Sequence, residues 1–571
     1  MTKQGSNGQP LSPIDLENSS KELSGATFGA MAGVVLSRLS GVIRQQILSF
    51  VFGAGMATDA FNIAARYPNG LRDLLADGAL SSALTKSLVD AKASGRDAER
   101  KLIAVVTGFF AIITLVLALI GFAYAEPFMR LTTSQAFQNR PGSLKLATNL
   151  FRMMVFYLPI VMFTASSMAI LGVYRQTFRA TFASSFFNIG NIVGAIALAP
   201  LFYWLGQDPI YGLASGAILG GLFQFLFSAR PLKKIDLLVM PKVGWNDVVG
   251  YKPLREVLSI MAPRAISQGA MIIALFVNTL LASGGNGTIT YISSAQTIIL
   301  VPVGLFGVAS GFSSLPVLTS AANESGGQRF SILLGQSVAS AMWLAFFSVI
   351  SFALLAGPFC ATLFAHGRFT QHDAAATAAA VCAYSIGVVF NSSSKVLQQG
   401  FFALGKTQQV VINSLIYLAV NATLSFLLSQ LSNGPVPFGI SNSIAAFTDF
   451  SLNVYFLHRI CNSRNINFFE HAAATGFSLK RIAMITALTF PIALAGIAIS
   501  WRWEIFATAF HAIPPFFLHL SGLAIGGFLL LILFAFLTHK YGPPSLYDFQ
   551  KRNLQKVARR LPAPLRRFTR L

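Results

Sequence analysis

The segment 102–125, LIAVVTGFFAIITLVLALIGFAYA, decides the fold class because it contains no charged residue. As an α-helix it would extend about 36 Å at 1.5 Å per residue. The hydrocarbon core of a bilayer is about 30 Å thick, so this segment can cross it. Four further apolar runs approach or exceed the same length: 151–173, 330–357, 482–501 and 515–537.

The composition of the whole chain agrees with a membrane protein. Of its 571 residues, 54% are hydrophobic and only 11% are charged, whereas soluble domains carry about 25% charged residues. Alternating segments of about ten residues, typical of outer-membrane barrels, are absent. The sequence therefore predicts an all-α polytopic membrane protein.

The hydropathy pattern predicts fourteen membrane spans, and the loop charges predict their orientation. The spans are 24–52, 58–90, 102–125, 147–173, 178–205, 209–229, 254–284, 288–318, 330–356, 373–404, 407–431, 437–459, 479–501 and 513–538. Lys and Arg are concentrated in the even-numbered connections and in the C-terminal tail. Because basic loops stay in the cytoplasm, we expect both termini there.

Polar stretches divide the chain further. Residues 1–22 are polar throughout and indicate a disordered cytoplasmic arm instead of a cleavable signal. Residues 230–253 mix basic and apolar side chains, which is typical of an amphipathic segment at the cytoplasmic surface. The basic tail 541–571 is interpreted as a topological anchor, with binding of anionic headgroups or an acidic partner as the alternative. The net charge of +22 is spread over short loops, so we expect no nucleic-acid binding.

Several chemical classes find no support in the sequence. The three cysteines have no CxxC spacing, so neither disulfides nor a metal site is expected. A GxxxxGK[ST] motif is absent, which argues against ATP hydrolysis by this chain. With no nucleophile–base arrangement either, we expect no enzyme activity and no cofactor.

Ionisable residues inside the predicted spans carry most of the functional information. An Arg or Asp at the bilayer centre costs about 2.5–3.5 kcal/mol, so it normally faces a partner or a cavity. Arg38 and Arg44 lie in the first span, about 120° apart around the helix, and can border one wide cavity. Apolar sequence on both sides makes interfacial snorkelling a weaker interpretation for these two.

The second span adds Asp59, Arg66, Arg72, Asp73 and Asp77. Together, the first two spans hold four arginines against three aspartates, and the excess positive charge favours an anionic substrate. The planar fork of arginine suits phosphate or pyrophosphate. For Asp59, Arg72, Asp73 and Asp77, a position at the membrane interface remains an equal alternative.

Two further cations lie in the second half of the chain. Arg264 opens the seventh span directly after Pro263. Lys395 lies deep in the tenth span among serines and glutamines, which indicates water or a polar ligand. The alternative for Lys395 is a buried lysine that is satisfied by serine hydroxyls and backbone carbonyls.

Several motifs of the chain resemble the MurJ/MviN lipid II flippases of the MOP exporter superfamily. The motifs are SRLSGVIR (37–44), FGAGMATDAF (52–61), YPNGLRDLLADGALSSAL (67–84), FAHGRFTQHDA (364–374), AYSIG (383–387) and KVLQQGFFALGKT (395–407). The resemblance runs from about residue 27 to the last spans and is densest in the first two. It implies two pseudo-symmetric lobes, 23–229 and 254–460, around a cationic central cavity. It also implies that spans thirteen and fourteen, within 461–540, form a groove for the lipid tail.

The resemblance also implies a set of substrate-binding residues. They are Arg38, Arg44, Asp59, Arg66, Arg72 and Lys395, and we add Arg264 as a hypothesis. Many family members have an Asp-Arg pair where this chain has Gln296 and Thr297, and often Asp where it has Gln45. Arg264 would replace the positive charge that is missing at Thr297.

The expected function is therefore the flipping of lipid II, an undecaprenyl-pyrophosphate disaccharide pentapeptide, from the cytoplasmic to the periplasmic leaflet by alternating access. Expected partners are lipid II or a similar polyprenyl-pyrophosphate glycolipid, membrane lipids, and proteins of cell-wall synthesis or division. The expected location is the bacterial inner membrane. Two alternatives stay open, namely an exporter of another polyprenyl-linked glycolipid and a non-transporting scaffold that binds the precursor.

Overall fold

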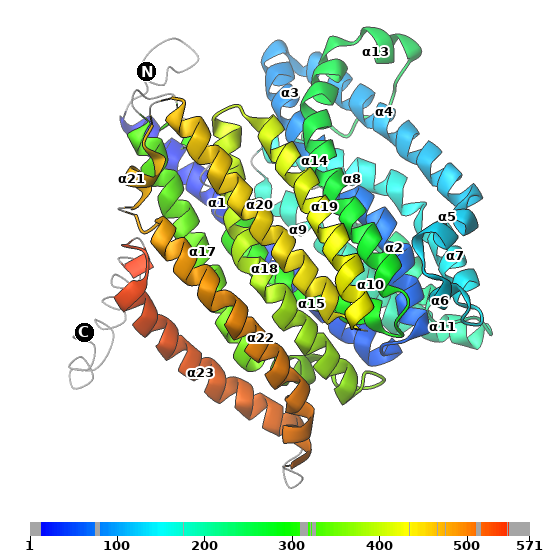
Figure 1. Ribbon diagram of the computed structural model, residues 1–571. Coiled ribbons are helices and arrows are strands. Elements are labelled where there is room, and N and C mark those ends of the chain that lie inside the picture. Colours follow the sequence, from blue (N-terminus) through cyan, green and yellow to red (C-terminus); the bar gives the residue numbers. More distant parts are fainter. Residues whose placement is uncertain are drawn as a thin grey trace, which may run out of the picture. The chain divides into compact units, whose positions relative to one another are not determined.

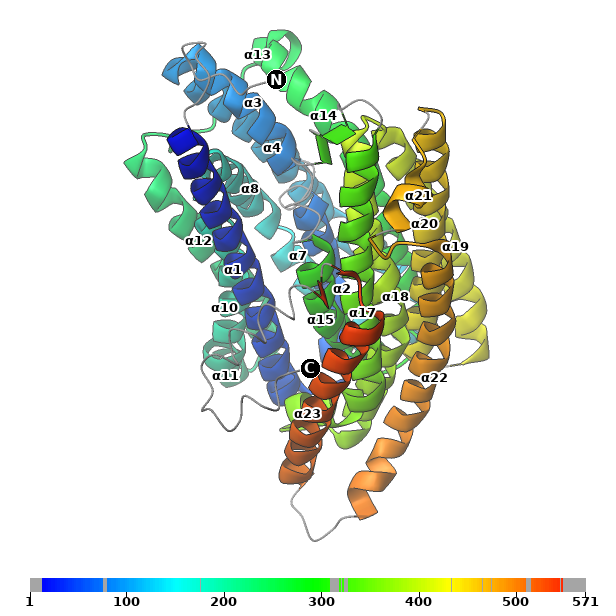
Figure 2. The same ribbon diagram turned by 90° about the vertical axis from the view of Figure 1, so that its left-hand side faces the viewer.

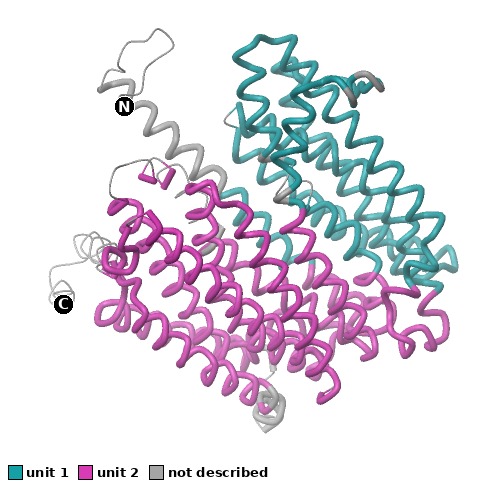
Figure 3. Tube along the Cα trace, turned by 45° about the horizontal axis from the view of Figure 1, so that its top comes forward, with its two compact units in different colours: residues 1–44, 64–129, 145–265 teal, residues 45–63, 130–144, 266–571 magenta. Residues whose placement is uncertain are grey.

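The computed structural model describes most of the chain, and every regular element in the described residues is a helix (Figure 1). The described residues are 13–74, 80–174, 176–308, 318–319, 321–322, 327–432, 434–464, 466–473, 475–509, 515–544 and 546–547. They divide into two compact units (Figure 3). The all-α fold class is thereby confirmed.

Unit 1 comprises residues 1–44, 64–129 and 145–265. Its helices are α3 (Leu80–Ser94), α4 (Arg96–Ala123), α7 (Ser143–Met154), α8 (Tyr157–Val173), α9 (Thr177–Phe182), α10 (Ser185–Val193), the π-helical turn η2 (Gly194–Leu198), α11 (Ala199–Trp204), α12 (Tyr211–Lys234) and α13 (Trp245–Gly250). The predicted surface segment 230–253 contains the end of α12 and the short helix α13.

Unit 2 comprises residues 45–63, 130–144 and 266–571. Its helices are α6 (Gln135–Gln138), α15 (Thr288–Pro302), the π-helical turn η3 (Val303–Val308), α17 (Gln328–Phe364), α18 (Gln371–Ala403), α19 (Thr407–Leu431), α20 (Val436–Asn462), α21 (Phe468–Ala473), α22 (Leu479–Ala509) and α23 (Pro515–Tyr541).

Five helices of the described residues contain a boundary between the units: α1 (Pro13–Phe52), α2 (Met56–Leu74), α5 (Ala125–Thr132), α14 (Lys252–Ala282) and also α7, whose first two residues, Ser143 and Leu144, belong to unit 2. Helix α1 begins at Pro13, inside the stretch 1–22 that was predicted to be a disordered arm, and residues 1–12 lie outside the described part.

Ten helices of the described residues are long and apolar enough to cross a membrane. The pair α7–α8, bent by 40°, makes an eleventh. These eleven correspond to eleven of the fourteen predicted spans. The other three predictions, 24–52, 58–90 and 437–459, fall on α1, on α2 with α3, and on α20. These helices carry buried or partly buried charged residues, which lower their hydropathy, and their membrane crossing stays a prediction.

Helix α18 forms the centre of unit 2. It packs against α15, α17, α20 and α22, and its most apolar stretch is completely buried. The start of the helix is fixed by a capping box, in which Thr370 N donates to Asp373 Oδ2 at 2.8 Å and Asp373 N donates to Thr370 Oγ1 at 3.2 Å. The run of alanines that follows allows neighbouring helices to approach closely.

Helices α22 and α23 end the described chain, and both pack against α17 (Figure 2). Most of the apolar surface of α23 is exposed, including Phe528, Leu531 and Phe536. Such a surface is unfavourable in water and is expected to face lipid.

Glycines set the helix packing in unit 1. Gly212, Gly216 and Gly220 lie four residues apart on α12 and therefore form one face. This face packs directly on Gly190 of α10 and on Gly194 of η2. Backbones can approach this closely only because none of the five residues has a Cβ atom.

We predict that Gly190→Ala destabilises unit 1. A Cβ at Gly190 would overlap the Cα of Gly220 and the carbonyl oxygen of Gly216, and overpacking of this kind costs about 1–3 kcal/mol. The thermal unfolding of the purified protein in detergent should shift to lower temperature. Gly172→Ala in α8 is the matched control, because a Cβ there meets no atom within 4 Å. Equal unfolding temperatures for the two variants would contradict the packing argument.

Candidate functional site

Helix α1 carries the first two predicted arginines, and its polar residues attach it to the start of α10. Asn188 Nδ2 donates to Ser40 Oγ at 2.8 Å and to Ser37 O at 3.2 Å, and the hydroxyls of Ser37 and Ser184 are 2.9 Å apart. These bonds fix the rotation of α1 within unit 1. Arg38, next to Ser37, is partly exposed and forms no hydrogen bond or ion pair with the described residues.

Arg44 and Arg72 come together in unit 1. They lie close enough to repel each other, although 28 residues of sequence separate them. The Nε atom of Arg44 is buried and has no hydrogen-bond partner among the described residues. Two positive charges at one place, one of them incompletely satisfied, create a strong local preference for an anion.

The surroundings of Arg72 hold its guanidinium in a defined plane. Its Nε and Nη2 donate to Asp73 Oδ1 at 3.0 and 2.8 Å. The guanidinium also lies over the ring of Phe187, 5.0 Å from the centroid, in a cation–π contact. We call the group Arg44, Arg72, Asp73 and Phe187 the arginine centre. The sequence analysis did not identify Phe187, because nothing in the apolar stretch around it marks this contact.

The partial compensation within the arginine centre leaves a net positive charge. Asp73 is 55% exposed, so water screens its attraction for Arg72. The arginine centre contains one carboxylate and two guanidinium groups, and it can therefore accept a further anion.

Arg66 lies on α2 in unit 1 and is buried, with 7% of its surface exposed. Its role in substrate binding stays a prediction.

Asp59 has a different environment, in unit 2, and is completely buried. Its Oδ2 accepts from Gly287 N at 2.7 Å, and its Oδ1 accepts from Thr290 N at 2.9 Å and from Thr290 Oγ1 at 2.7 Å. These donors belong to the N-terminal end of α15, where a helix favours negative charge. The geometry indicates that Asp59 positions α15, because its oxygens are occupied by bonds to that helix.

Neutral hydrogen bonds occupy the positions where many family members have charges. Gln45 Nε2 donates to the buried Ser294 Oγ at 2.9 Å, and Thr297 Oγ1 donates to the backbone oxygen of Ser293 at 2.9 Å. These bonds satisfy Gln45 and Thr297 without a charged partner. The hypothesis that Arg264 replaces the missing charge stays a prediction, because the Arg264 side chain lies outside the described part of the structure.

Lys395 lies on α18 in unit 2 and interacts electrostatically with Asp449 of α20. It therefore belongs to a second polar region and not to the unit that contains the arginine centre. The seven predicted residues are thus divided: Arg38, Arg44, Arg66 and Arg72 lie in unit 1 with the backbone of Arg264, whereas Asp59 and Lys395 lie in unit 2. No group of three or more His, Cys, Asp or Glu that could hold a metal occurs in the described residues.

We predict that Asp59→Asn lowers stability, because one carboxylate oxygen becomes an NH₂ donor that faces backbone N–H groups. Loss of a buried acceptor costs about 1–3 kcal/mol, and more for a charged group. Thermal unfolding in detergent measures the change. Asp73→Asn is the control, because its exposed pair with Arg72 contributes about 0–1 kcal/mol. Unfolding of Asp59→Asn at the wild-type temperature would show that the bonds to α15 do not stabilise the protein.

Comparisons with known proteins agree with this arrangement. The family model described as "Lipid II flippase MurJ" matches residues 48–519. The lipid II flippase MurJ of Burkholderia cenocepacia is 30% identical over 403 residues, which cover 70% of this chain and 75% of the relative. The probable lipid II flippase MurJ of Vibrio cholerae is 28% identical over 492 residues, covering 85% of this chain and 90% of the relative.

Solved structures show the same fold. A lipid II flippase MurJ in an inward closed conformation superimposes with a TM-score of 0.67 at 19% identity, covering 90% of this chain and 98% of that structure. An inward-facing multidrug resistance MATE transporter of the MOP superfamily gives a TM-score of 0.57 at 18% identity, covering 74% and 99%. The family match spans most of the chain, and the chain belongs to the MurJ family of lipid II flippases, which are multi-pass membrane transporters and not enzymes.

Proposed function

We propose that this chain moves lipid II across the bacterial inner membrane, from the cytoplasmic to the periplasmic leaflet. The observation that carries the proposal is the family match over residues 48–519. The arginine centre supports it independently, because a transporter of a pyrophosphate-linked lipid needs a cationic site inside its helices.

The pyrophosphate would bind at the arginine centre. Guanidinium groups bind phosphate oxygens through two parallel N–H···O bonds, and such charge-assisted bonds are stronger than neutral ones. Phe187 holds the plane of Arg72, which reduces the side-chain entropy that binding would otherwise cost. An incoming phosphate would also give the buried Nε of Arg44 the acceptor that the described residues do not provide.

The other predicted residues have supporting roles in this proposal. Arg38 and Arg66 would extend the positive surface of unit 1 toward the second phosphate and the sugars, and Arg264 and Lys395 would contribute further positive charge. Asp59 would act through α15, by fixing the position of that helix. Movement between conformations by alternating access requires such fixed contacts to form and break.

The lipid tail would stay outside the helical interior. The exposed apolar faces of α22 and α23, in the region 461–540, suit a polyprenyl chain, because they offer contact with hydrocarbon on one side. The predicted lobes 23–229 and 254–460 would enclose the sugar and the peptide.

The orientation of the chain completes the proposal. Both termini would be cytoplasmic, with the arm 1–22, the segment 230–253 and the basic tail 541–571 on that side. A membrane potential that is negative inside favours outward movement of an anion by about 2.3 kcal/mol per charge per 100 mV. Proteins of cell-wall synthesis or division would bind at the cytoplasmic segments.

One observation favours a second candidate function. The neutral bond between Gln45 and Ser294 stands where many family members have charges, and a different charge distribution suits a different polyprenyl-linked glycolipid. Competition by glycolipids that share the polyprenyl-pyrophosphate but differ in their sugars would distinguish the two substrates. A non-transporting scaffold would bind the precursor without moving it.

We predict that Arg44→Ala and Arg72→Ala each reduce lipid II flipping by about tenfold or more. Loss of one bond to a charged group costs about 1.5–3 kcal/mol, and 1.4 kcal/mol corresponds to a factor of ten. Fluorescent lipid II in proteoliposomes measures flipping, and growth of a flippase-depleted strain measures function in cells.

Arg100→Ala is the matched control for these two variants, because Arg100 is 44% exposed and pairs with the exposed Asp236 at 3.0 Å. It should flip lipid II at the wild-type rate. Wild-type flipping by both arginine variants would rule out the arginine centre as the pyrophosphate site. Binding of lipid II without any flipping by the unaltered chain would support the scaffold.

A further inference from the structure

A stripe of polar side chains runs along α19 inside unit 2. Its members are Gln409, Asn413, Tyr417, Asn421 and Ser425, spaced four residues apart, so that each lies about 40° around the helix axis from the one before and the stripe winds gradually around α19. The stripe extends about 24 Å, most of the thickness of the hydrocarbon core. Asn413, Asn421 and Ser425 have no exposed surface, and Tyr417 is 7% exposed. Polar side chains inside a membrane helix cost free energy, and they usually have a function there.

Hydrogen bonds connect one end of the stripe to the backbone of Asp449, a residue with a buried carboxylate. Gln409 Nε2 donates to Asn413 Oδ1 at 3.1 Å, and Asn413 Nδ2 donates to Asn453 Oδ1 at 3.0 Å. Asn453 Nδ2 then donates to the backbone oxygen of Asp449 at 2.8 Å. The series leads from the start of α19 to Asp449 on α20.

The Asp449 carboxylate is 7% exposed and incompletely satisfied. Its Oδ1 has no hydrogen-bond partner among the described residues. Lys395 of α18 attracts it electrostatically, but no N–O distance between them is within 4.0 Å. A separation beyond direct contact suits a bridging water.

Other buried polar atoms along the stripe also lack partners in the described part of the chain. Both side-chain polar atoms of Asn421 are in this state, together with the hydroxyl of Ser425. An unsatisfied buried group costs about 1–3 kcal/mol, and proteins normally satisfy such groups with ordered water. The stripe therefore offers a row of sites for water molecules.

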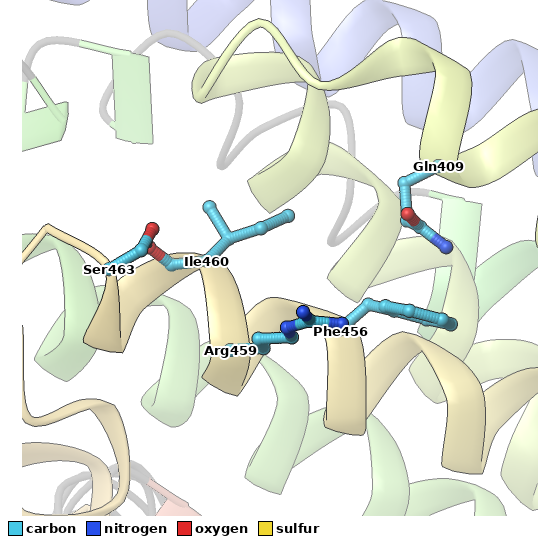
Figure 4. A pocket seen from close by; sticks show the side chains of 5 residues that line it. All are labelled: Gln409, Phe456, Arg459, Ile460 and Ser463. Carbon is cyan, nitrogen blue, oxygen red and sulfur yellow. Dashed lines mark hydrogen bonds between the residues drawn. The ribbon is translucent and has the colours of Figure 1, made fainter.

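A pocket gives this row access to solvent. It is lined by Gln409 of α19 and by Phe456, Arg459, Ile460 and Ser463 of α20 (Figure 4). Gln409 belongs both to the pocket and to the stripe. Asp449 lies ten residues before Arg459 on α20, about 15 Å along the helix axis.

We propose that Asp449 is a proton-binding site, reached from this pocket along the polar stripe, and that its protonation controls the rate of transport. The second part rests on the proposed function. One proton passes from water to a carboxylate oxygen of Asp449, where an O–H bond forms, and it leaves by reversal of the same step.

The charges around Asp449 favour a proton over a metal ion. The titratable groups that interact electrostatically with Asp449 are Lys395 on α18 and Tyr417 on α19, and Tyr417 in turn interacts with Tyr384 on α18. A positive ammonium group repels a metal cation, and a single carboxylate gives weak coordination. Protonation instead changes the Asp449–Lys395 pair from neutral to singly positive. In a medium of low dielectric constant, this change alters the attraction between α18 and α20, which pack against each other.

Infrared difference spectra of the full chain in lipid nanodiscs provide the test. As the pH falls from about 9 to about 4, we expect a carboxylic-acid C=O band that Asp449→Asn removes. Asp373→Asn is the matched control. Asp373 is also buried, but it accepts bonds from Tyr291 Oη at 2.6 Å and from Thr370 N and Oγ1 at 2.8 Å. The band assigned to Asp449 should therefore remain in Asp373→Asn.

A second variant keeps the test informative if Asp449→Asn does not fold. Lys395→Met removes the neighbouring charge and should raise the proton affinity of Asp449 at least about tenfold. The pH at which the carboxylic-acid band appears should then rise by about one unit or more. Lipid II flipping in vesicles should depend on pH in the wild type and lose that dependence in Asp449→Asn.

The infrared band and the flipping assay test the proton site and the proposed flippase function separately. If the vesicles show no lipid II flipping at all, the proposed function fails, and the infrared band still tests the proton site. A spectrum without a band from Asp449, an unchanged band position in Lys395→Met, or wild-type pH dependence in Asp449→Asn would overturn the inference.

Discussion

The high cost of an uncompensated charge in hydrocarbon governs the interior of this protein. Different contacts stabilise the described charged residues inside the helices. Asp59 is satisfied by three hydrogen bonds from the start of α15, and Arg72 by Asp73 and the face of Phe187. Arg44 and Asp449 each retain a buried polar atom without a partner among the described residues. A ligand or a proton would be stabilised where it supplies the partner that Arg44 or Asp449 lacks.

Arg44 and Asp449 have opposite signs and lie in different units. In unit 1, the excess is positive and suits the phosphates of a lipid-linked substrate. In unit 2, a carboxylate lies near one ammonium group and a row of neutral polar side chains, which suits a small, mobile positive charge. Substrate binding and control of the transport rate would then use separate groups of residues.

Close helix packing provides the frame for both regions. Glycines of α12 meet glycines of α10 and η2 in unit 1, and the alanines of α18 are surrounded by four helices in unit 2. Within a membrane, apolar side chains gain little by leaving lipid, so close backbone contact and buried hydrogen bonds hold the helices together. The Gln45–Ser294 bond shows that a neutral pair can connect α1 to α15 where many family members use charges.

The sequence by itself determined the all-helical membrane class, eleven of the spans and the family, because hydropathy and local motifs depend only on neighbouring residues. It also identified Arg38, Arg44 and Lys395 as unusual, because a charge within an apolar run is visible without any structure.

Only the tertiary structure decided which of these residues meet. It brought Arg72 to Arg44 and Phe187, placed Asp59 at α15 and not at the arginines, and aligned the α19 stripe with Asp449. These partners are separated by 28 to 228 residues of sequence. Their contacts depend on how distant helices rotate and pack, and no local pattern in the chain records that rotation.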